Sequence, residues 1–304
     1  MPNHFRELFL SFLHTSFRQR HRSLLTCVLV VGIGVSSQAM ASVTIAITGG
    51  PTAAAVYQAA SLARQQGVDV KVREFSDWIT PNSAVVNGDA DINYFQHRPF
   101  LANAEKQAGF TLVPLAFGVE NNIGLYSNTL KKASDIQQGG RVAIADDPVN
   151  QSRGLRLLED VGLIKLKPGV GDNATLFDIE DNPRQLKFTE LPGPQLVRSL
   201  PDVDIAEGYP ADLIGSGVKD PTDALALTHD KHHTYALVFA VRPEDVKRKD
   251  INTFIHIYQT APEVREILAH ALLSPRLYQL AWLDSNGKPG PTPLELEQRT
   301  KGGE

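Results

Sequence analysis

Cysteine is almost absent from this chain of 304 residues. The single example, Cys27, lies in an amino-terminal segment that we expect to be removed, so the mature protein would carry no thiol. That absence excludes disulfides, cysteine nucleophiles and cysteine-ligated metal sites. The chain also lacks the G-x-S-x-G, H-E-x-x-H and P-loop motifs, so the sequence indicates neither an enzyme nor a cofactor.

Long apolar runs are equally scarce, and the one example, Leu24–Val35, follows a group of arginines near the amino terminus. A transmembrane anchor is the alternative, but at about 1.5 Å per residue the run is shorter than a hydrocarbon core of about 30 Å. Ala39 and Ala41 have the A-x-A spacing of signal-peptidase sites, so we predict a secretory signal, residues 1–41, cleaved after Ala41. Cys27 lies near the start of the run instead of its end, so we expect no lipobox and no lipid anchor.

Positive charge is too scarce for a nucleic-acid or membrane surface. Removing the leader removes four Lys or Arg residues and one Glu, which leaves 26 basic and 33 acidic residues and a net charge of −7. We therefore expect a soluble protein that binds neither nucleic acid nor an anionic membrane.

From residue 43 onward, short apolar runs alternate with amphipathic ones, as in α/β proteins. The first series predicts strands at 43–48, 68–75, 90–95 and 110–118, with helices at about 52–66, 80–87 and 99–108 between them. The second series predicts strands at 141–147, 186–191, 202–209 and 224–227, with helices at about 150–162 and 193–200. A last strand at 235–242 and helices at 251–258 and 262–273 follow. Thr80 and Asn150 are the expected N-caps of their helices.

This order predicts mostly parallel sheets with helices on both faces, arranged in two lobes. The expected division is 42–125 and 231–275 for the first lobe, 126–230 for the second lobe, and 276–304 for a carboxy-terminal extension without an assigned role. The chain would cross between the lobes twice, through Gly118–Ser127 and His229–Thr234. Because ligands of open α/β sheets bind beyond the carboxyl ends of strands, we expect a cleft between the lobes.

Aromatic and polar side chains gather where the predicted strand INYFQH ends. Alternation places Asn93, Phe95 and His97 on one face and Gln96 on the other. With Trp78, which follows the preceding strand, Phe95 and His97 can form an aromatic wall that suits an apolar or thioether side chain. The alternative is that all three are core residues.

Two segments of the second series carry charged candidates. Arg153 lies in the first turn of its helix, next to Asn150, where a guanidinium and a positive helix end favour a carboxylate; the alternative is a surface Arg paired with a nearby acid. Glu207 and Tyr209 share one face at the end of another strand, and Glu207 is either a partner for a ligand ammonium or a solvated carboxylate.

A histidine cluster offers a different kind of site. His229, His232 and His233 lie in the sequence HDKHH and could bind a metal through their imidazoles. The alternative is a hydrated loop.

Several segments together resemble the methionine-binding (MetQ/NlpA) family of ABC-importer substrate-binding proteins. They are FSDWITPNSAVVNGDADINYFQHRPFL, IGLYS, VAIADDPVNQSRGLRLLEDVGLIKLKPG, LKFTEL and YALVFAVR, and the likeness extends from about Val43 to Leu273. The resemblance implies a two-lobed type II periplasmic-binding fold that captures free methionine and delivers it to a membrane permease and its ATPase. It also implies a periplasmic, monomeric protein that is not an enzyme.

The resemblance assigns roles residue by residue. It implies that Trp78, which stands where the family usually has Tyr, joins Phe95 and His97 around the methionine side chain. It implies that Asn150 and Arg153 hold the amino-acid head, with Arg153 on the carboxylate.

Two asparagine anchors of the family are absent from this chain. The family's I-N-T-N-Y region reads AEGYP here, and Leu237 replaces the Asn of its Y-V-N-L strand. Glu207 or Tyr209 could replace these anchors and change the ligand. We therefore predict a periplasmic substrate-binding protein for methionine or a related amino acid. The alternatives are zinc or nickel capture through the histidine cluster and an enzyme that has borrowed the fold.

Overall fold

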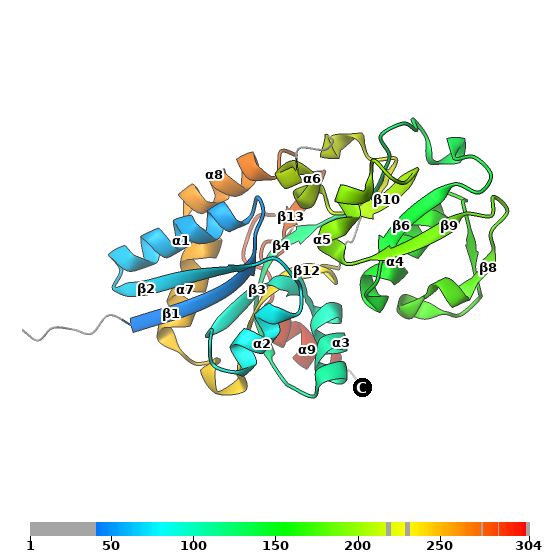
Figure 1. Cartoon of the computed structure of the whole chain (residues 1–304). Coiled ribbons are helices and arrows are strands. Elements are labelled where there is room, and N and C mark those ends of the chain that lie inside the picture. Colours follow the sequence, from blue (N-terminus) through cyan, green and yellow to red (C-terminus); the bar gives the residue numbers. More distant parts are fainter. Residues whose placement is uncertain (1–40, 217–219, 229–231, 275, 285, 302–304) are drawn as a thin grey trace, which may run out of the picture. The chain divides into compact units, whose positions relative to one another are not determined.

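Two β-sheets organise the chain in the computed structural model, which describes residues 41–216, 220–228, 232–274, 276–284 and 286–301 (Figure 1). The first sheet has six strands, in the order β13 (Tyr278–Leu280), β4 (Val113–Asn121), β12 (Ala236–Val241), β3 (Ile92–His97), β1 (Ala41–Thr48) and β2 (Val68–Phe75). The second has five, in the order β11 (Ala226–Leu227), β5 (Gly124–Tyr126), β10 (Ile205–Gly208), β6 (Arg141–Ala145) and β9 (Lys187–Leu191). A short pair, β7 (Lys165–Leu166) and β8 (Ile179–Asp181), lies apart from them. The predicted signal, except for Ala41, lies outside the described residues.

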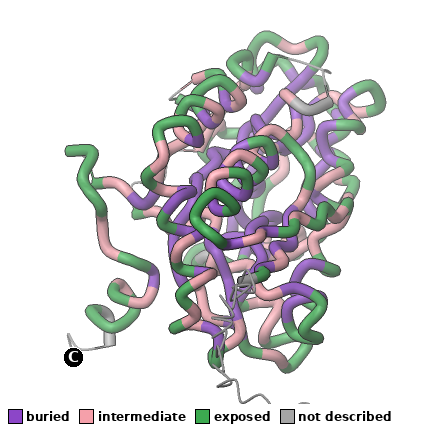
Figure 2. The backbone as a smooth tube through the Cα atoms, turned by 90° about the vertical axis from the view of Figure 1, so that its left-hand side faces the viewer, coloured by how far each residue is buried: buried purple, intermediate pink, exposed green. Residues whose placement is uncertain are grey.

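Helices cover both faces of each sheet, as alternating apolar runs predict. On the first sheet, α1 (Ala53–Gln65), α7 (Lys249–Thr260) and α8 (Pro262–Ala271) pack on one face, and α2 (Thr80–Val86) and α3 (Arg98–Ala108) on the other. On the second sheet, α4 (Pro148–Asp160) packs on one face, and α5 (Gly193–Leu196) and α6 (Pro210–Ser216) on the other. The central strands β3, β12, β6 and β10 are therefore largely buried, whereas β9 and β13 at the sheet edges are partly exposed. Figure 2 shows the buried segments in the interior of the molecule.

Strand β1 shows why the apolar runs are continuous. Ile45 and Ile47 enter the core beneath α1, α7 and α8, whereas Ala46 between them enters the core beneath α2 and α3. The middle of β1, Ile45–Ile47, is therefore buried on both faces and apolar, whereas Ser42, Thr44 and Thr48 are exposed or partly exposed.

Both sheets are mixed instead of mostly parallel. Strand β1 pairs in parallel with β2 and β3, and β6 pairs in parallel with β9 and β10. Strand β12, however, returns from the second sheet and inserts antiparallel between β3 and β4. Strand β5 is likewise antiparallel to β10, because it follows the first crossover directly.

Neither predicted residue is an N-cap: the N-cap of α2 is Ile79 and that of α4 is Asp147, and an aspartate accepts backbone N–H groups at the start of each helix. Asp77 accepts the backbone N–H groups of Ile79 and Thr80, so Thr80 is the first residue of α2 and not its N-cap. Asp147 is the N-cap of α4 and accepts the N–H of Asn150 at 2.9 Å. A carboxylate three residues before a backbone N–H satisfies it as well as Thr or Asn does. Asn150 therefore lies inside the helix.

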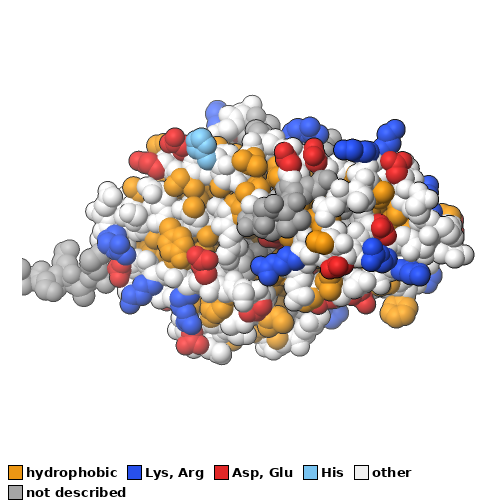
Figure 3. Space-filling model, turned by 45° about the horizontal axis from the view of Figure 1, so that its top comes forward, with side chains coloured by type: hydrophobic (Ala, Val, Ile, Leu, Met, Phe, Trp, Pro, Cys, Tyr) orange, Lys and Arg blue, Asp and Glu red, His pale blue; other side chains and the backbone are white. Residues whose placement is uncertain are grey.

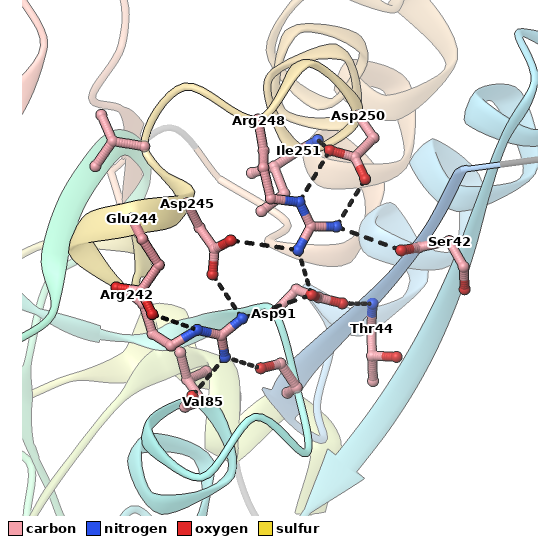
Figure 4. Close-up of polar contacts among 12 residues, drawn as sticks. Ser42, Thr44, Val85, Asp91, Arg242, Glu244, Asp245, Arg248, Asp250 and Ile251 are labelled. Atoms are coloured by element: carbon pink, nitrogen blue, oxygen red, sulfur yellow. Dashed lines mark hydrogen bonds and ion pairs between the residues drawn. The ribbon is translucent and has the colours of Figure 1, made fainter.

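A network of ion pairs holds the returning segment against the first sheet (Figure 4). Asp91 accepts the backbone N–H of Thr44 in β1 at 2.7 Å and pairs with Arg248. Arg242 donates to the carbonyl oxygen of Val85 at 2.7 Å and pairs with Asp245. None of these residues lines the cavity described below, and the contacts hold the segment after β12 against β1 and α2.

Residues 276–301 continue the first sheet. Strand β13 pairs with β4, and Trp282 is 6% exposed, with its ring 5.8 Å from that of Tyr258 and its Nε1–H donated to the carbonyl oxygen of Gln259. Helix α9 (Pro293–Lys301) packs against β4. The extension is therefore part of the first core.

The surface carries charges of both signs. On the face drawn in Figure 3, Lys and Arg side chains alternate with Asp and Glu, and neither sign forms a continuous patch. Within the described ranges, no helix has the length and hydropathy to span a membrane.

Candidate ligand-binding site

A cavity lies between the two sheets, which belong to one compact unit, residues 40–304. It has about 590 Å³ of empty space, part of which is open to solvent. Its lining residues come from both lobes: Thr48, Gly49, Gly50, Pro51, Thr52, Trp78, Phe95, Gln96, His97, Phe100, Asn121, Asn150, Tyr209, Ala211, Asp212 and Leu237.

An aromatic wall forms the first-lobe side of this cavity. Phe100 meets both Trp78 and Phe95 edge to face, with ring centroids 6.1 Å apart in each pair. Trp78 also meets Tyr209 of the second lobe at 5.8 Å. The sequence analysis missed Phe100, although it lies one helical turn after His97 and so returns to the same place.

The large ring of Trp78 fits because residue 193 is a glycine. A Cβ at Gly193 would lie 2.0 Å from the Trp78 ring. Because Gly193 begins α5 in the second lobe, this contact joins the two lobes directly beside the cavity.

Phe95 is the extra residue of a β-bulge. In the register of β3 with β12, Tyr94 pairs with Phe239 and Gln96 with Val238, so Phe95 has no partner. The predicted alternation is therefore wrong after Tyr94. Gln96 donates to Asn93 at 3.1 Å, although alternation had placed the two side chains on opposite faces, and Gln96 also lines the cavity.

His97 is held as a neutral imidazole with a defined tautomer. Its Nδ1 accepts the backbone N–H of Phe100 at 3.1 Å, so Nε2 carries the proton and donates to Asn150 Oδ1 at 3.1 Å. Burial, and after it the positive charge of Arg153, lowers the pKa of His97 to about 3. His97 thus joins the lobes as a hydrogen-bond donor at any pH near neutrality.

Three donors converge on the side-chain oxygen of Asn150. Besides His97, the Tyr209 hydroxyl donates to Asn150 Oδ1 at 2.6 Å and Arg153 Nη1 at 3.3 Å. Asn150 Nδ2 donates to Asp147, which fixes the orientation of the amide. An amide oxygen has two lone pairs, so three donors exceed its capacity. The same donors could serve a ligand carboxylate.

Arg153 lies one layer behind the cavity surface. Its guanidinium donates to the Tyr209 hydroxyl at 2.9 Å and lies over the rings of Tyr235 and Tyr209, at 4.0 and 5.6 Å from their centroids. Arg153 is 6% exposed, and its Nε has no hydrogen-bond partner within the described part of the chain. The guanidinium is therefore buried and connected to the cavity through Tyr209 and Asn150.

Glu207 does not reach the cavity. Its Oε2 accepts the backbone N–H of Ala145 at 3.0 Å, and a Cβ at Gly154 would lie 2.4 Å from the same oxygen. Burial raises the pKa of Glu207 to about 8, although the Ala145 N–H and the charge of Arg153 lower it. Tyr209, which was grouped with Glu207 in the sequence analysis, does line the cavity, and burial raises the pKa of its phenol. Leu237, at the position of a missing asparagine, also lines the cavity.

The histidine cluster shows no metal centre in the described ranges. His229 lies outside them, and His233 Nδ1 lies 2.7 Å from Glu120 Oε2. Across the described residues, no group of three or more His, Cys, Asp or Glu side chains could hold an ion.

The two crossovers between the sheets lie side by side. Ile123 donates its N–H to the Thr228 hydroxyl at 3.0 Å and accepts the Thr228 N–H at 2.9 Å. His233 and Glu120 add a second contact between the same segments. A pair of bonded crossovers is the arrangement expected of a hinge.

Comparisons with known proteins agree with this geometry. The family model described as NlpA lipoprotein matches residues 43–275. The D-methionine-binding lipoprotein MetQ of Yersinia pestis is 34% identical over 241 residues, which cover 78% of this chain and 89% of that protein. MetQ of Escherichia coli K12 is 37% identical over 196 residues, which cover 64% of this chain and 72% of that protein. A nutrient-binding protein of Burkholderia cenocepacia, solved bound to methionine, has a TM-score of 0.72 and 36% identity, over 76% of this chain and 97% of that one.

Proposed function

Because this chain belongs to the NlpA lipoprotein family, we propose that it is the substrate-binding component of an ABC importer and binds methionine or a closely related amino acid. Family membership confirms the resemblance noted in the sequence. Two relatives are named for D-methionine, and a solved neighbour at 36% identity holds methionine. A protein of this kind delivers its ligand to a permease and carries out no reaction on it.

One observation carries the proposal: donors from both lobes converge at Asn150 in a cavity that otherwise has an aromatic wall. A ligand carboxylate can accept from Tyr209 and Arg153 in place of the overloaded amide oxygen. A thioether side chain can pack against Trp78 and Phe95, since sulfur contacts with aromatic rings are favourable.

We propose that binding closes the lobes about the paired crossovers. Trp78, Phe95 and His97 come from the first lobe, and Asn150, Arg153 and Tyr209 from the second, so a ligand that contacts both sets favours the closed form. We place the first lobe at 42–125 and 231–275, with the carboxy-terminal segment added to its sheet, and the second at 126–230. Glu207 supports the second-lobe wall from behind.

We also propose that the protein acts on the periplasmic side of the membrane as a monomer, after cleavage at Ala41. Several relatives are named lipoproteins, whereas Cys27 is positioned near the start of the apolar run. The release of a mature chain without cysteine would leave the protein free to diffuse.

Thermal unfolding and calorimetric titration of the purified protein test the proposal. A ligand at 100 times its dissociation constant stabilises the folded state by about 2.7 kcal/mol, which raises the unfolding midpoint by several degrees. We expect D- or L-methionine, or a closely related amino acid, to raise it, and unrelated amino acids, zinc and nickel to leave it unchanged.

The variant Arg153→Ala should lose the methionine response, because the buried positive charge that attracts the carboxylate is removed. Arg156→Ala is the matched control, since Arg156 is on the same helix and its partners are Glu159 and the carbonyl oxygen of Gly171. If zinc raises the unfolding midpoint and methionine does not, the protein captures a metal and the proposal is wrong.

A further inference from the structure

Asp212 in α6 faces the cavity and takes no part in the contacts above. Of the described residues that line the cavity, it alone is an Asp, Glu, Lys or Arg. It also lines an adjoining cavity beside Glu74 and Arg198, with Trp78 shared between the two spaces. A charged group of a ligand in either of the two cavities can therefore contact the Asp212 carboxylate.

The Asp212 carboxylate has no partner of its own. The backbone N–H of Asp212 donates to the carbonyl oxygen of Tyr209 at 3.0 Å, but within the described part of the chain no hydrogen bond or ion pair reaches the side chain. Burial raises the pKa of Asp212 to about 7, and the charge of Arg198 opposes this only at longer range. An unpaired carboxylate in such a place costs folding free energy. A cation from the ligand would offset that cost.

The position of Asp212 suits an α-amino acid. Tyr209 and Asp212 are one turn apart and line the same side of the cavity, so an acceptor for a cation and donors for an anion lie on one wall. The ammonium and carboxylate of an amino acid share one carbon and need such a pair. Leu237 on the opposite lobe offers neither charge nor hydrogen bond.

We infer that Asp212 pairs with the ammonium group of the ligand and so makes the cavity select free amino acids over carboxylic acids of the same shape. The inference rests on the proposed function and adds a specificity-determining residue to it. The aromatic wall recognises the side chain, the Tyr209–Asn150–Arg153 group recognises the carboxylate, and Asp212 recognises the amine.

Titration calorimetry with two probes tests the inference. The probes are methionine and 4-(methylthio)butanoic acid, which is methionine without its amino group. The wild-type protein should bind methionine at least about tenfold more tightly than the des-amino acid, because a charge-assisted hydrogen bond is lost with the amine. In Asp212→Asn the two affinities should agree within about threefold, through weaker methionine binding.

Asp212→Asn keeps the side-chain shape and removes an unpaired, partly buried carboxylate, so its unfolding midpoint should equal or exceed that of the wild type. Glu74→Gln is the control, because Glu74 lines the adjoining cavity only. An Asp212→Asn protein that still prefers methionine as strongly as the wild type overturns the inference and leaves the proposed function intact. A wild-type protein that binds neither probe overturns the proposed ligand, and the inference with it.

Discussion

At the scale of single residues, burial suppresses the ordinary charge of the groups around the cavity. The pKa of His97 is lowered to about 3 and that of Glu207 is raised to about 8, in both cases chiefly by desolvation. Both side chains are therefore neutral when the pH is near 7. Arg153 is left as the positive centre behind Asn150 and Tyr209.

Glu207 should make stability depend on pH. The pKa of its carboxyl is 4.5 in the unfolded chain and about 8 in the folded one. Its contribution to the free energy of unfolding is therefore complete below pH 4.5 and is lost as the pH rises through 8. Glu207→Gln keeps the acceptor for Ala145 and cannot ionise. We expect its unfolding midpoint to exceed that of the wild type by several degrees at pH 8.5, with the gap closing by pH 5.

The control for this experiment is Glu266→Gln, on the exposed face of α8, which should show the same difference from the wild type at every pH. A gap for Glu207→Gln that does not change with pH would mean that the carboxyl is already ionised in the folded protein at pH 5.

The sequence was sufficient to predict several of the residues that line the cavity, but not the contacts that hold those residues in place. Trp78, Phe95, His97, Asn150 and Tyr209 all line it, because strand ends and helix starts converge between the lobes. The placement of Arg153 behind Tyr209 depends on the ring of Tyr235, which is 82 residues further along the chain. Contacts of that kind leave no local pattern. The bulge at Phe95 is equally invisible, since it is set by the register with β12.

At the scale of helices and strands, the order of elements followed from hydrophobic periodicity, whereas strand direction and capping did not. Alternating runs predicted the strands from β1 to β4 and the helices between them. The insertion of β12 between β3 and β4 is decided by tertiary packing. Asp77 and Asp147 accept the backbone N–H groups of Thr80 and Asn150, the two residues that were expected to be N-caps.

The contact between α5 and the loop after β2 should control binding. Gly193→Ala would place a methyl group 2.0 Å from the Trp78 ring, which must then leave the aromatic wall. We expect methionine affinity to fall by about tenfold or more, with little change in the midpoint of the unliganded protein. Calorimetric titration measures the first quantity and thermal unfolding the second.

Two companion variants make the result specific. Gly290→Ala is the control, because a Cβ there has no neighbour nearer than 3.7 Å. Adding Trp78→Phe to Gly193→Ala should restore part of the affinity, since the smaller ring leaves room for the methyl group. If the double variant binds methionine no more tightly than Gly193→Ala alone, the loss of affinity in Gly193→Ala does not arise from the contact with Trp78.

At the scale of the whole molecule, the two tryptophans serve different parts of it. Trp78 stands in the cavity wall, whereas Trp282 closes the first core over Tyr258. No pattern in the sequence joins the carboxy-terminal extension to the fold, because β13 is three residues long and its pairing partner β4 is far away in the chain.

Replacing the two tryptophans by alanine should therefore change different properties: Trp282→Ala should lower the stability of the protein, and Trp78→Ala should lower its affinity for methionine. Trp282→Ala removes a buried ring, which costs about 3–5 kcal/mol and should lower the unfolding midpoint by roughly 10 °C without weakening methionine binding. Trp78→Ala should weaken binding and change the midpoint little. Calorimetry on both proteins measures the two effects, and weaker binding in Trp282→Ala would show that the extension acts on the cleft.

The bonded crossovers have an evolutionary consequence. Since Ile123 and Thr228 contact each other, the chain enters and leaves the second lobe at one point, and residues 124–227 form an insertion whose two ends meet. Such an insertion can be exchanged between related proteins without disturbing the host sheet. Arg153, Tyr209 and Asp212 lie within it, so the amino-acid head recognition that we propose for them can be inherited as a module, separately from the aromatic wall of the first lobe.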